Sequence, residues 1–243
     1  MEMKQLLEKN RVMHDMMRRA TVDALDVQQA TEQLHQLMQC GIYMIDKDGA
    51  FLSMKDSDTM QIFSITELEE QHCSPETLQW LFHSQQPIYN QVCGENYCSI
   101  LPVRNQFGQI GVLLCGQDEN EFLEEQLLLA EYAATLVAVM MMRSSSRKAE
   151  TEARKKNVVQ LALEVLSYSE LEAVKYIFHE IDGNEGFLVA SKLAEEYKLT
   201  RSVIVNALRK LESAGVIDAR SLGMKGTYIK ILNDYLYEEL EAI

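Results

Sequence analysis

The chain has 243 residues and a mass of 27.8 kDa, a length that fits one large domain or two small ones. Hydrophobic residues make up 47% and charged residues 25%, a globular balance that excludes wholesale disorder, and only 3 Pro and 11 Gly argue against a many-turned all-β fold. The formal net charge is -14 with a pI near 4.8, which over the whole chain argues against a nucleic-acid partner.

The sequence gives no sign of export, a membrane span or a metal site. The amino-terminal residues are charged throughout, unlike a signal peptide, and the most apolar run, 127–142, contains Glu131 and is shorter than the roughly 20 residues of a membrane helix. The five cysteines form no C-x-x-C pair and show no zinc-like spacing: Cys40, Cys73, Cys93, Cys98 and Cys115. We expect a cytoplasmic protein with reduced thiols.

The acidic charge is unevenly distributed along the chain. Residues 1–146 contain 9 Lys or Arg and 21 Asp or Glu, a net charge of -12, whereas residues 147–243 contain 14 and 16, a net charge of -2. Within the second part, residues 186–232 carry 8 basic and 4 acidic residues, a net charge of +4. A small basic module near the C-terminus is therefore predicted, and the whole-chain charge does not exclude DNA.

The front half alternates between helical and hairpin patterns. Apolar periodicity and turn residues predict helices over 2–19, 27–39 and 75–83, and strands over 41–45, 50–54, 97–103 and 110–115. The turn between the first two strands is Asp46-Lys47-Asp48-Gly49, in which Gly can take a positive φ. This order predicts an α+β sandwich of the type that senses small ligands.

From about Asn120 to Ser167 the sequence predicts one long helix, because Pro and Gly are absent from it. The polar stretch 143–147 has poorer helix propensity, so we place a hinge there. The predicted organisation is a sensor and dimerisation domain over 1–142, a linker helix over 143–168 and a DNA-binding domain over 169–243.

The C-terminal part has the order of a winged helix-turn-helix. Helices are predicted over 169–181, 188–197 and 201–214, and strands over 216–220 and 227–231, with a turn over 182–186 and a basic loop over 221–226. Ser169 and Thr200 are the expected helix caps, and Gly215 is expected to end the third of these helices in a left-handed conformation.

A winged helix-turn-helix needs short polar side chains near the start of its second helix, because these reach the base edges. Thr200, Arg201, Ser202 and Asn206 fit that need, with Asn206 as the expected base reader. The expected phosphate contacts are Lys192, Arg209, Lys210, Arg220 and Lys225. The expected packing side is Val203, Val205, Leu208 and Leu211. The alternative is that these are solvated charges on an ordinary small helical domain.

The residues of this region carry a resemblance. LTRSVIVNALRKLESAGVI followed by RSLGMKGTYIK resembles the C-terminal domain of the CodY family of global transcriptional repressors. The resemblance is strong over 167–233, weaker through EYAATLVAVMMMR and ARKKNVVQLALEVLSYSE, and over 40–116 it rests on the order of elements. It implies a helix-turn-helix over 190–209, and it adds Ala190, Ser191, Val203 and Ser221 to the expected DNA contacts.

The resemblance also implies a cytoplasmic homodimer with an N-terminal GAF sensor domain. It implies binding of branched-chain amino acids, isoleucine foremost, a reported response to GTP, and repression of genes for nitrogen metabolism and stationary phase. The chain contains no G-x-x-x-x-G-K-[ST] motif, so GTP sensing rests on the resemblance alone.

The sensor half departs from the family pattern. The resemblance implies that an Arg after the first hairpin holds the ligand carboxylate, but no Lys or Arg occurs between Lys55 and Arg104. Arg104 or backbone N–H groups would have to substitute; otherwise amino-acid binding is lost. The candidate apolar walls, which plain core packing explains equally, are Met60, Phe63, Pro75, Leu78, Tyr97 and Pro102.

Two other classes of function, an enzyme and a protein-binding adaptor, fit the sequence less well. An enzyme would need a nucleophile and an oriented base, and the adjacent His72-Cys73 offers neither a nucleophile elbow nor an orienting partner. A protein-binding adaptor that lacks DNA readout would not need the basic pattern over 192–230. We therefore expect a ligand-responsive DNA-binding repressor without catalytic residues.

Overall fold

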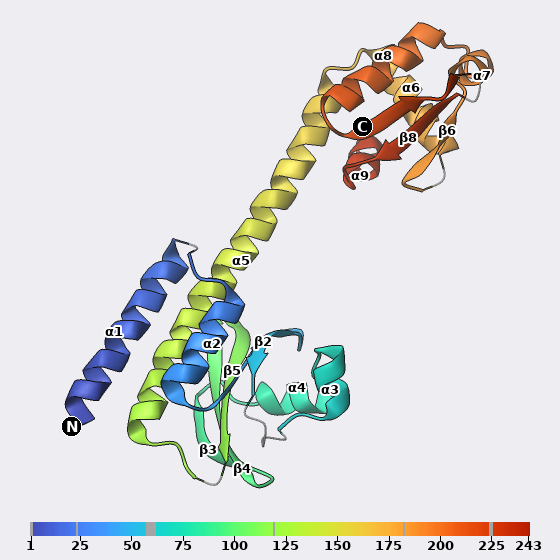
Figure 1. Ribbon diagram of the computed structural model, residues 1–243. Helices are drawn as coiled ribbons and strands as arrows, with labels where there is room; N and C mark the ends of the chain where they lie inside the picture. The colour runs from blue at the N-terminus through green and yellow to red at the C-terminus, as the bar shows by residue number, and fades with distance from the viewer. Residues whose placement is uncertain (1, 23, 57–61, 119, 182, 224–225) are drawn as a thin grey trace. The chain divides into compact units, whose positions relative to one another are not determined.

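The computed structural model describes residues 2–22, 24–56, 62–118, 120–181, 183–223 and 226–243 (Figure 1). The chain divides into two compact units, residues 1–146 (the N-terminal unit) and 147–243 (the C-terminal unit). The division falls within the polar stretch 143–147, at which the sequence predicts a hinge, but the structure shows helix α5 (Glu124–Glu164) without a break there. Two of the predicted site residues, Met60 and Lys225, lie outside the described residues.

The N-terminal unit confirms the predicted alternation of helices and hairpins. Its elements are α1 (Glu2–Thr21), α2 (Val27–Met38), β1 (Gly41–Asp46), β2 (Phe51–Lys55), α3 (Ile65–Glu70), α4 (Pro75–Leu81), β3 (Ile88–Cys93), β4 (Asn96–Asn105), β5 (Gly108–Asp118) and α5 (Glu124–Glu164), which continues into the C-terminal unit. Sequence periodicity missed α3 and β3, because six residues are too few to establish a period.

Among the described residues, five strands of the N-terminal unit form an antiparallel sheet in the order β2-β1-β5-β4-β3. Tyr43 pairs with Leu114, and Met44 pairs with Leu113. Successive side chains alternate between the two faces of a strand, so Met44 and Leu113 face one side while Tyr43 and Leu114 face the other. The sheet thus separates two apolar clusters.

Helices α2 and α5 cover the Met44 face, and α1 lies alongside them on the side away from the sheet (Figure 1). Met16 of α1, Leu34 of α2 and Leu136 of α5 are each at most 1% exposed in this core. Their burial, at roughly 25 cal/mol per Å² of apolar surface, is the main force that holds the helices together on this side of the sheet.

Helix α5 is long and apolar enough, by length and composition, to cross a membrane, with an 18-residue window of mean hydropathy 1.4. In the structure Leu129, Ala133, Leu136 and Val137 of this helix are at most 1% exposed and belong to the N-terminal core. Core helices of soluble proteins share that composition, so packing against the sheet accounts for the apolar window.

The opposite face of the sheet carries α3 and α4 over an aromatic cluster, which we define as Tyr43, Phe51 and Phe63. The Phe63 ring stands edge-on to Tyr43 at 5.0 Å and to Phe51 at 4.9 Å. This geometry suits the quadrupoles of aromatic rings. Phe63 and Leu78, two of the predicted ligand residues, belong to the apolar core on this side of the sheet.

The C-terminal unit contains, besides the end of α5, α6 (Tyr168–Glu180), β6 (Glu185–Leu188), α7 (Ala190–Glu196), α8 (Arg201–Ser213), β7 (Ile217–Ser221), β8 (Thr227–Ile231) and α9 (Leu236–Glu241). Among the described residues its strands form an antiparallel sheet in the order β6-β8-β7. The order helix, strand, helix, turn, helix, hairpin confirms the predicted winged helix-turn-helix arrangement.

Two local predictions in this unit were wrong. Ser167 caps α6, not Ser169: Glu170 Oε2 accepts a hydrogen bond from Ser167 N at 2.7 Å, and Ser167 Oγ accepts one from Glu170 N. Both serines begin a Ser-x-x-Glu pattern, and the buried Glu170 selects the first. Residues 185–186 were predicted as turn but begin β6, which forms by pairing with the distant β8.

In the N-terminal unit, Glu67 links the starts of α3 and α4. Its Oε2 accepts hydrogen bonds from Ser64 N at 2.9 Å and Ser64 Oγ at 2.7 Å, and its Oε1 accepts one from Ser74 N at 2.8 Å. Burial raises the pKa of Glu67, but the hydrogen bonds from Thr77, Ser74 and Ser64 outweigh it and lower the pKa to about 2. The carboxylate therefore holds the helix pair that covers the aromatic cluster.

We predict that Glu67→Ala lowers the free energy of unfolding of the N-terminal unit by about 2 kcal/mol, because two helix starts lose a charged acceptor. The fluorescence of Trp80, the one Trp in the chain, reports this in urea. Because the folded pKa lies below its usual 4.5, the contribution of Glu67 is fully present above about pH 4.5 and disappears as the pH falls toward 2. The exposed Glu69→Ala is the control; equal losses in the two variants would contradict the account.

Candidate nucleic-acid interface and ligand cavities

The turn between α7 and α8 is tight and locally determined. Lys198 has a positive φ of 55°, and Leu199 N donates to Ala194 O at 2.9 Å, which reverses the chain. Thr200 then caps α8, because its Oγ1 accepts a hydrogen bond from Val203 N at 3.4 Å. The predicted cap is confirmed, and the hydroxyl of Thr200 is already engaged in the fold.

Helix α8 is held by its apolar side and leaves its polar side in solvent. Its buried residues are Ile204, Ala207, Leu208 and Leu211. Arg201, Ser202 and Asn206 are exposed, as the predicted reading side of the helix requires. Val203 is half-buried against the core of the unit, so the structure assigns it to packing, whereas it was predicted both as packing and as a DNA contact.

The wing is the hairpin β7–β8, closed by a short loop. Leu222 N donates to Gly226 O at 2.8 Å, and Gly226 has a φ of 96°. A Cβ at position 226 would lie 2.4 Å from Leu188 O, so only glycine lets the base of the wing lie this close to β6. The sequence analysis predicted a loop here from its glycines, but it did not predict that the loop lies close to β6.

A cavity of about 450 Å³ lies between the start of α7, helix α8 and the wing; we call it the wing cavity. Its polar and charged lining includes Ser191, Arg201, Arg209, Glu212, Ser221 and Thr227. The structure thus brings together predicted residues from three separate segments, Ala190 included. Lys192 and Arg220 are exposed on flanking elements, and Arg220 also pairs with Asp218 at 2.8 Å.

Lys210 does not join the wing cavity. Its Nζ lies 2.7 Å from Glu170 Oε2 and 3.0 Å from Val165 O, so the ammonium is committed to the joint between α5, α6 and α8. Glu170 is 7% exposed, and the hydrogen bond from Lys210 lowers its pKa. Lys210 thus stabilises this joint of the C-terminal unit, and its predicted phosphate contact stays a prediction.

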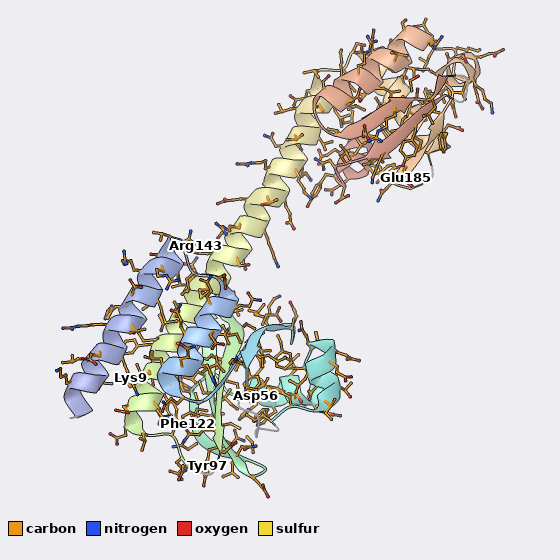
Figure 2. All side chains as sticks on the ribbon, in the orientation of Figure 1. Lys9, Asp56, Tyr97, Phe122, Arg143 and Glu185 are labelled. Atoms are coloured by element: carbon orange, nitrogen blue, oxygen red, sulfur yellow. The ribbon has the colours of Figure 1, made fainter. Side chains whose placement is uncertain are left out.

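The predicted ligand residues of the N-terminal unit do not converge on one cavity. Phe63 and Leu78 belong to the apolar cluster under α3 and α4, whereas Pro75 is exposed at the start of α4. Tyr97 is half-buried on β4, where it pairs with Val92 and Gln117, and it is labelled in Figure 2. Pro102 lines a different cavity, together with Arg104.

This second cavity, which we call the α5 cavity, has a volume of about 610 Å³ and lies between β3, β4 and α5. Its apolar lining comes from Pro87, Leu101, Pro102, Ala134 and Ala138. Its charged groups are Arg104, whose Nη1 donates to Gln85 O at 3.4 Å, and Glu131, which accepts a hydrogen bond from the Tyr89 hydroxyl. The sequence analysis predicted Arg104 as a ligand residue, but it treated Glu131 only as a charge within the apolar run of the long helix.

Within the aromatic cluster, the buried Tyr43 interacts with the half-buried Asp56. Burial raises the pKa of Tyr43, and the neighbouring carboxylate of Asp56 raises it further. Asp56 follows β2 and is labelled in Figure 2. The apolar run 41–45 did not indicate, from the sequence alone, that Tyr43 within it makes a polar contact.

Among the residues that the structure describes, no group of three or more His, Cys, Asp or Glu side chains could hold a metal ion. Two histidines make local contacts with backbone carbonyls: His72 Nδ1 lies 2.9 Å from Cys73 O, and His35 Nδ1 lies 2.8 Å from Cys40 O.

Comparison with known families matches both units of the chain. The family model of the CodY GAF-like domain matches residues 5–165, and that of the CodY helix-turn-helix domain matches residues 184–243. The global transcriptional regulator CodY of Clostridium botulinum (strain Okra / Type B1) is 42% identical over 262 aligned positions, covering 99% of this chain and 100% of that protein.

A second relative has the same printed name. The global transcriptional regulator CodY of Exiguobacterium sibiricum is 42% identical and covers 98% of each chain. The solved cofactor-binding GAF domain of the nutrient sensor CodY from Clostridium difficile is 17% identical, with a TM-score of 0.42 over 56% of this chain and 96% of that one.

Proposed function

Since the chain belongs to the CodY family of transcriptional regulators, we propose that its C-terminal unit represses transcription by binding double-stranded DNA under the control of an effector in the N-terminal unit. The observation that carries the proposal is the wing cavity, where a helix-turn-helix and a wing bring Arg201 and Arg209 together in an otherwise acidic chain. We assign the protein to the cytoplasm, where its DNA target lies.

We assign the exposed residues to phosphate contacts or to base contacts according to where they lie. Arg201 at the start of α8 and Arg209 two turns later line the wing cavity, which suits contact with the sugar-phosphate backbone. Ser202 and Asn206 lie exposed on the same helix and are proposed to reach base edges, Asn206 through its amide. Lys192, Arg220 and the wing residue Lys225 extend the phosphate contacts.

We predict that Arg201→Ala with Arg209→Ala weakens binding to a mixed-sequence duplex and reduces the salt slope of log K by about 2, since each phosphate contact contributes about 0.9. Fluorescence anisotropy of the full chain at several salt concentrations measures this. Lys175→Ala, an exposed lysine of α6 outside the wing cavity, is the control and should leave the slope unchanged. A slope that the double variant leaves unaltered would remove these arginines from the interface.

For the effector we propose a branched-chain amino acid, isoleucine foremost, held in the α5 cavity. The guanidinium of Arg104 suits the carboxylate, the carboxylate of Glu131 suits the ammonium group, and Leu101, Pro102 and Ala134 offer apolar walls. The aromatic cluster is a less suitable site, because the described residues between Lys55 and Arg104 include no cation for the carboxylate.

Calorimetry of the full chain with isoleucine tests the site. We predict that Arg104→Ala weakens binding at least about 10-fold through loss of a charge-assisted hydrogen bond, and that Arg104→Lys recovers part of the loss. Phe63→Leu, in the aromatic cluster, is the matched control and should leave binding unchanged. Equal weakening by Phe63→Leu would place the site at the aromatic cluster, and no heat with the wild-type chain would favour the alternative, a sensor that has lost amino-acid binding.

Two further features of the family are proposed for this chain on the resemblance. A response to GTP would need a site other than a P-loop.

A homodimer would present two reading helices to DNA half-sites about one helical turn apart, or a multiple of it. Exposed apolar side chains on α5, Leu128 at 43% and Tyr132 at 40%, are available to such a contact. The genes proposed to be regulated are those of nitrogen metabolism and stationary phase.

A further inference from the structure

A single carboxylate joins three helices of the C-terminal unit. Glu170, in the first turn of α6, is 7% exposed, and its Oε2 lies 2.7 Å from Ser167 N and 2.7 Å from Lys210 Nζ. The same ammonium donates to Val165 O, just after the end of α5, at 3.0 Å. The end of α5, the start of α6 and the second half of α8 therefore meet at these four residues, which we call the three-helix joint.

The ion pair at the three-helix joint is better fixed than an ordinary surface pair. Exposed ion pairs contribute little, because water screens the charges and both side chains are mobile. Here the Glu170 side chain is only 9% exposed and the Lys210 side chain is 40% exposed. The ammonium also lies at the carboxyl end of α5, where the helix dipole favours a positive charge. These contacts hold Lys210 against α5 and α6.

Lys210 lies at one border of the buried side of α8. Successive residues of a helix are about 100° apart, so Lys210 lies about 40° around the axis from Asn206, four residues earlier. It lies about 60° from Ala207, which is buried in the core of the unit. Lys210 therefore stands between the buried side of the helix and the proposed reading side, which carries Ser202 and Asn206.

The opposite border of α8 faces the wing. Arg201, Val205 and Glu212 line the wing cavity and lie about 140–180° around the axis from Lys210. Helix α8 packs against β7 of the wing and against α6. The wing and the three-helix joint thus hold opposite borders of the helix, and together they set its rotation about its own axis.

From this arrangement we propose that Lys210 is a positioning residue for base reading: through Glu170 and the end of α5 it fixes the rotation of α8 that directs Asn206 to a base edge. The inference rests on the proposed DNA binding. Side chains end about 6 Å from a helix axis, so a rotation of about 20° moves their ends by about 2 Å, enough to lose a hydrogen bond to a base. This role is an alternative to the predicted phosphate contact of Lys210.

Positioning and phosphate contact have different signatures. Removing a lysine that contacts a phosphate lowers the salt slope and weakens binding to all sequences about equally. Removing a lysine that positions α8 lowers the preference for one sequence over another and leaves the salt slope unchanged. Glu170 separates the two further, because removing an acidic charge favours DNA binding in general, yet at the three-helix joint it should cost selectivity.

The test uses the full chain and a pool of DNA duplexes with a randomised centre. Repeated selection and sequencing identify the sequence that the wild type prefers. Fluorescence anisotropy then measures the affinity for that duplex and for a scrambled one at several salt concentrations. We expect that Lys210→Met lowers the ratio of the two affinities at least about 10-fold and leaves the salt slope on the scrambled duplex unchanged. Lys210→Arg, which can still pair with Glu170, should retain most of the ratio.

Glu170→Gln is the second variant, because glutamine keeps the hydrogen bond from Ser167 N and loses the charge. It should lower the ratio as Lys210→Met does, and the double variant should lower it no further, since each change removes the same contact. Lys175→Met, at an exposed lysine of α6, is the matched control and should change neither the ratio nor the slope. Circular dichroism verifies that each variant is folded.

Two results would overturn the proposal. If Lys210→Met lowers the salt slope by about 0.9 and leaves the ratio unaltered, Lys210 contacts a phosphate instead. If Glu170→Gln leaves the ratio unaltered, the three-helix joint does not position the reading helix, and this result decides even if Lys210→Met fails to fold. A wild-type chain that binds no duplex, or prefers none, would instead refute the proposed function and this inference with it.

Discussion

Helix α5 contributes side chains to two hydrophobic cores, and the rest of the molecule depends on this. Leu129 and Leu136 are buried in the core of the N-terminal unit, and Val159 and Leu163 in that of the C-terminal unit. The helix runs unbroken from Glu124 to Glu164, through the polar stretch 143–147. Neither core is complete without its part of α5, so the two units share one hydrogen-bonded backbone element.

This shared helix connects the proposed ligand site in the N-terminal unit with the proposed DNA-binding unit. Glu131, Ala134 and Ala138 of α5 line the α5 cavity, so a ligand there would contact the helix that also supplies Val159 to the core beneath α8. A ligand shifts the equilibrium between two conformations of a protein only if it binds one of them more tightly. In the α5 cavity the ligand would contact α5, the helix that connects the two units.

Local signals in the sequence predicted the local structure well. The Thr200 cap, the left-handed Gly215 and the hairpin around Asp46–Gly49 depend on few neighbouring residues, and the structure contains each. The order of elements and the charge of segment 186–232 sufficed to predict the winged helix-turn-helix and, with its motifs, the family.

The parts that sequence analysis missed depend on distant partners. Strand β6 exists because it pairs with β8, about forty residues later, and the ion pair of Lys210 forms because the fold brings Glu170 beside it. Phe63 and Leu78, in the core under α3 and α4, could not be separated from Pro102 and Arg104, at the α5 cavity, without the three-dimensional arrangement of the strands and helices.

The most direct test of coupling through α5 interrupts the helix between the two cores. Ser145→Pro removes a backbone donor from the polar stretch and should break the helix locally at a cost of about 3 kcal/mol, whereas Ser145→Ala keeps it. The measurement is fluorescence anisotropy of labelled DNA with and without isoleucine. Isoleucine should tighten DNA binding by the wild type and by Ser145→Ala. Ser145→Pro should bind DNA as the wild type does without isoleucine, but isoleucine should not change its affinity for DNA. An undiminished response in Ser145→Pro, or none in the wild type, would contradict the account.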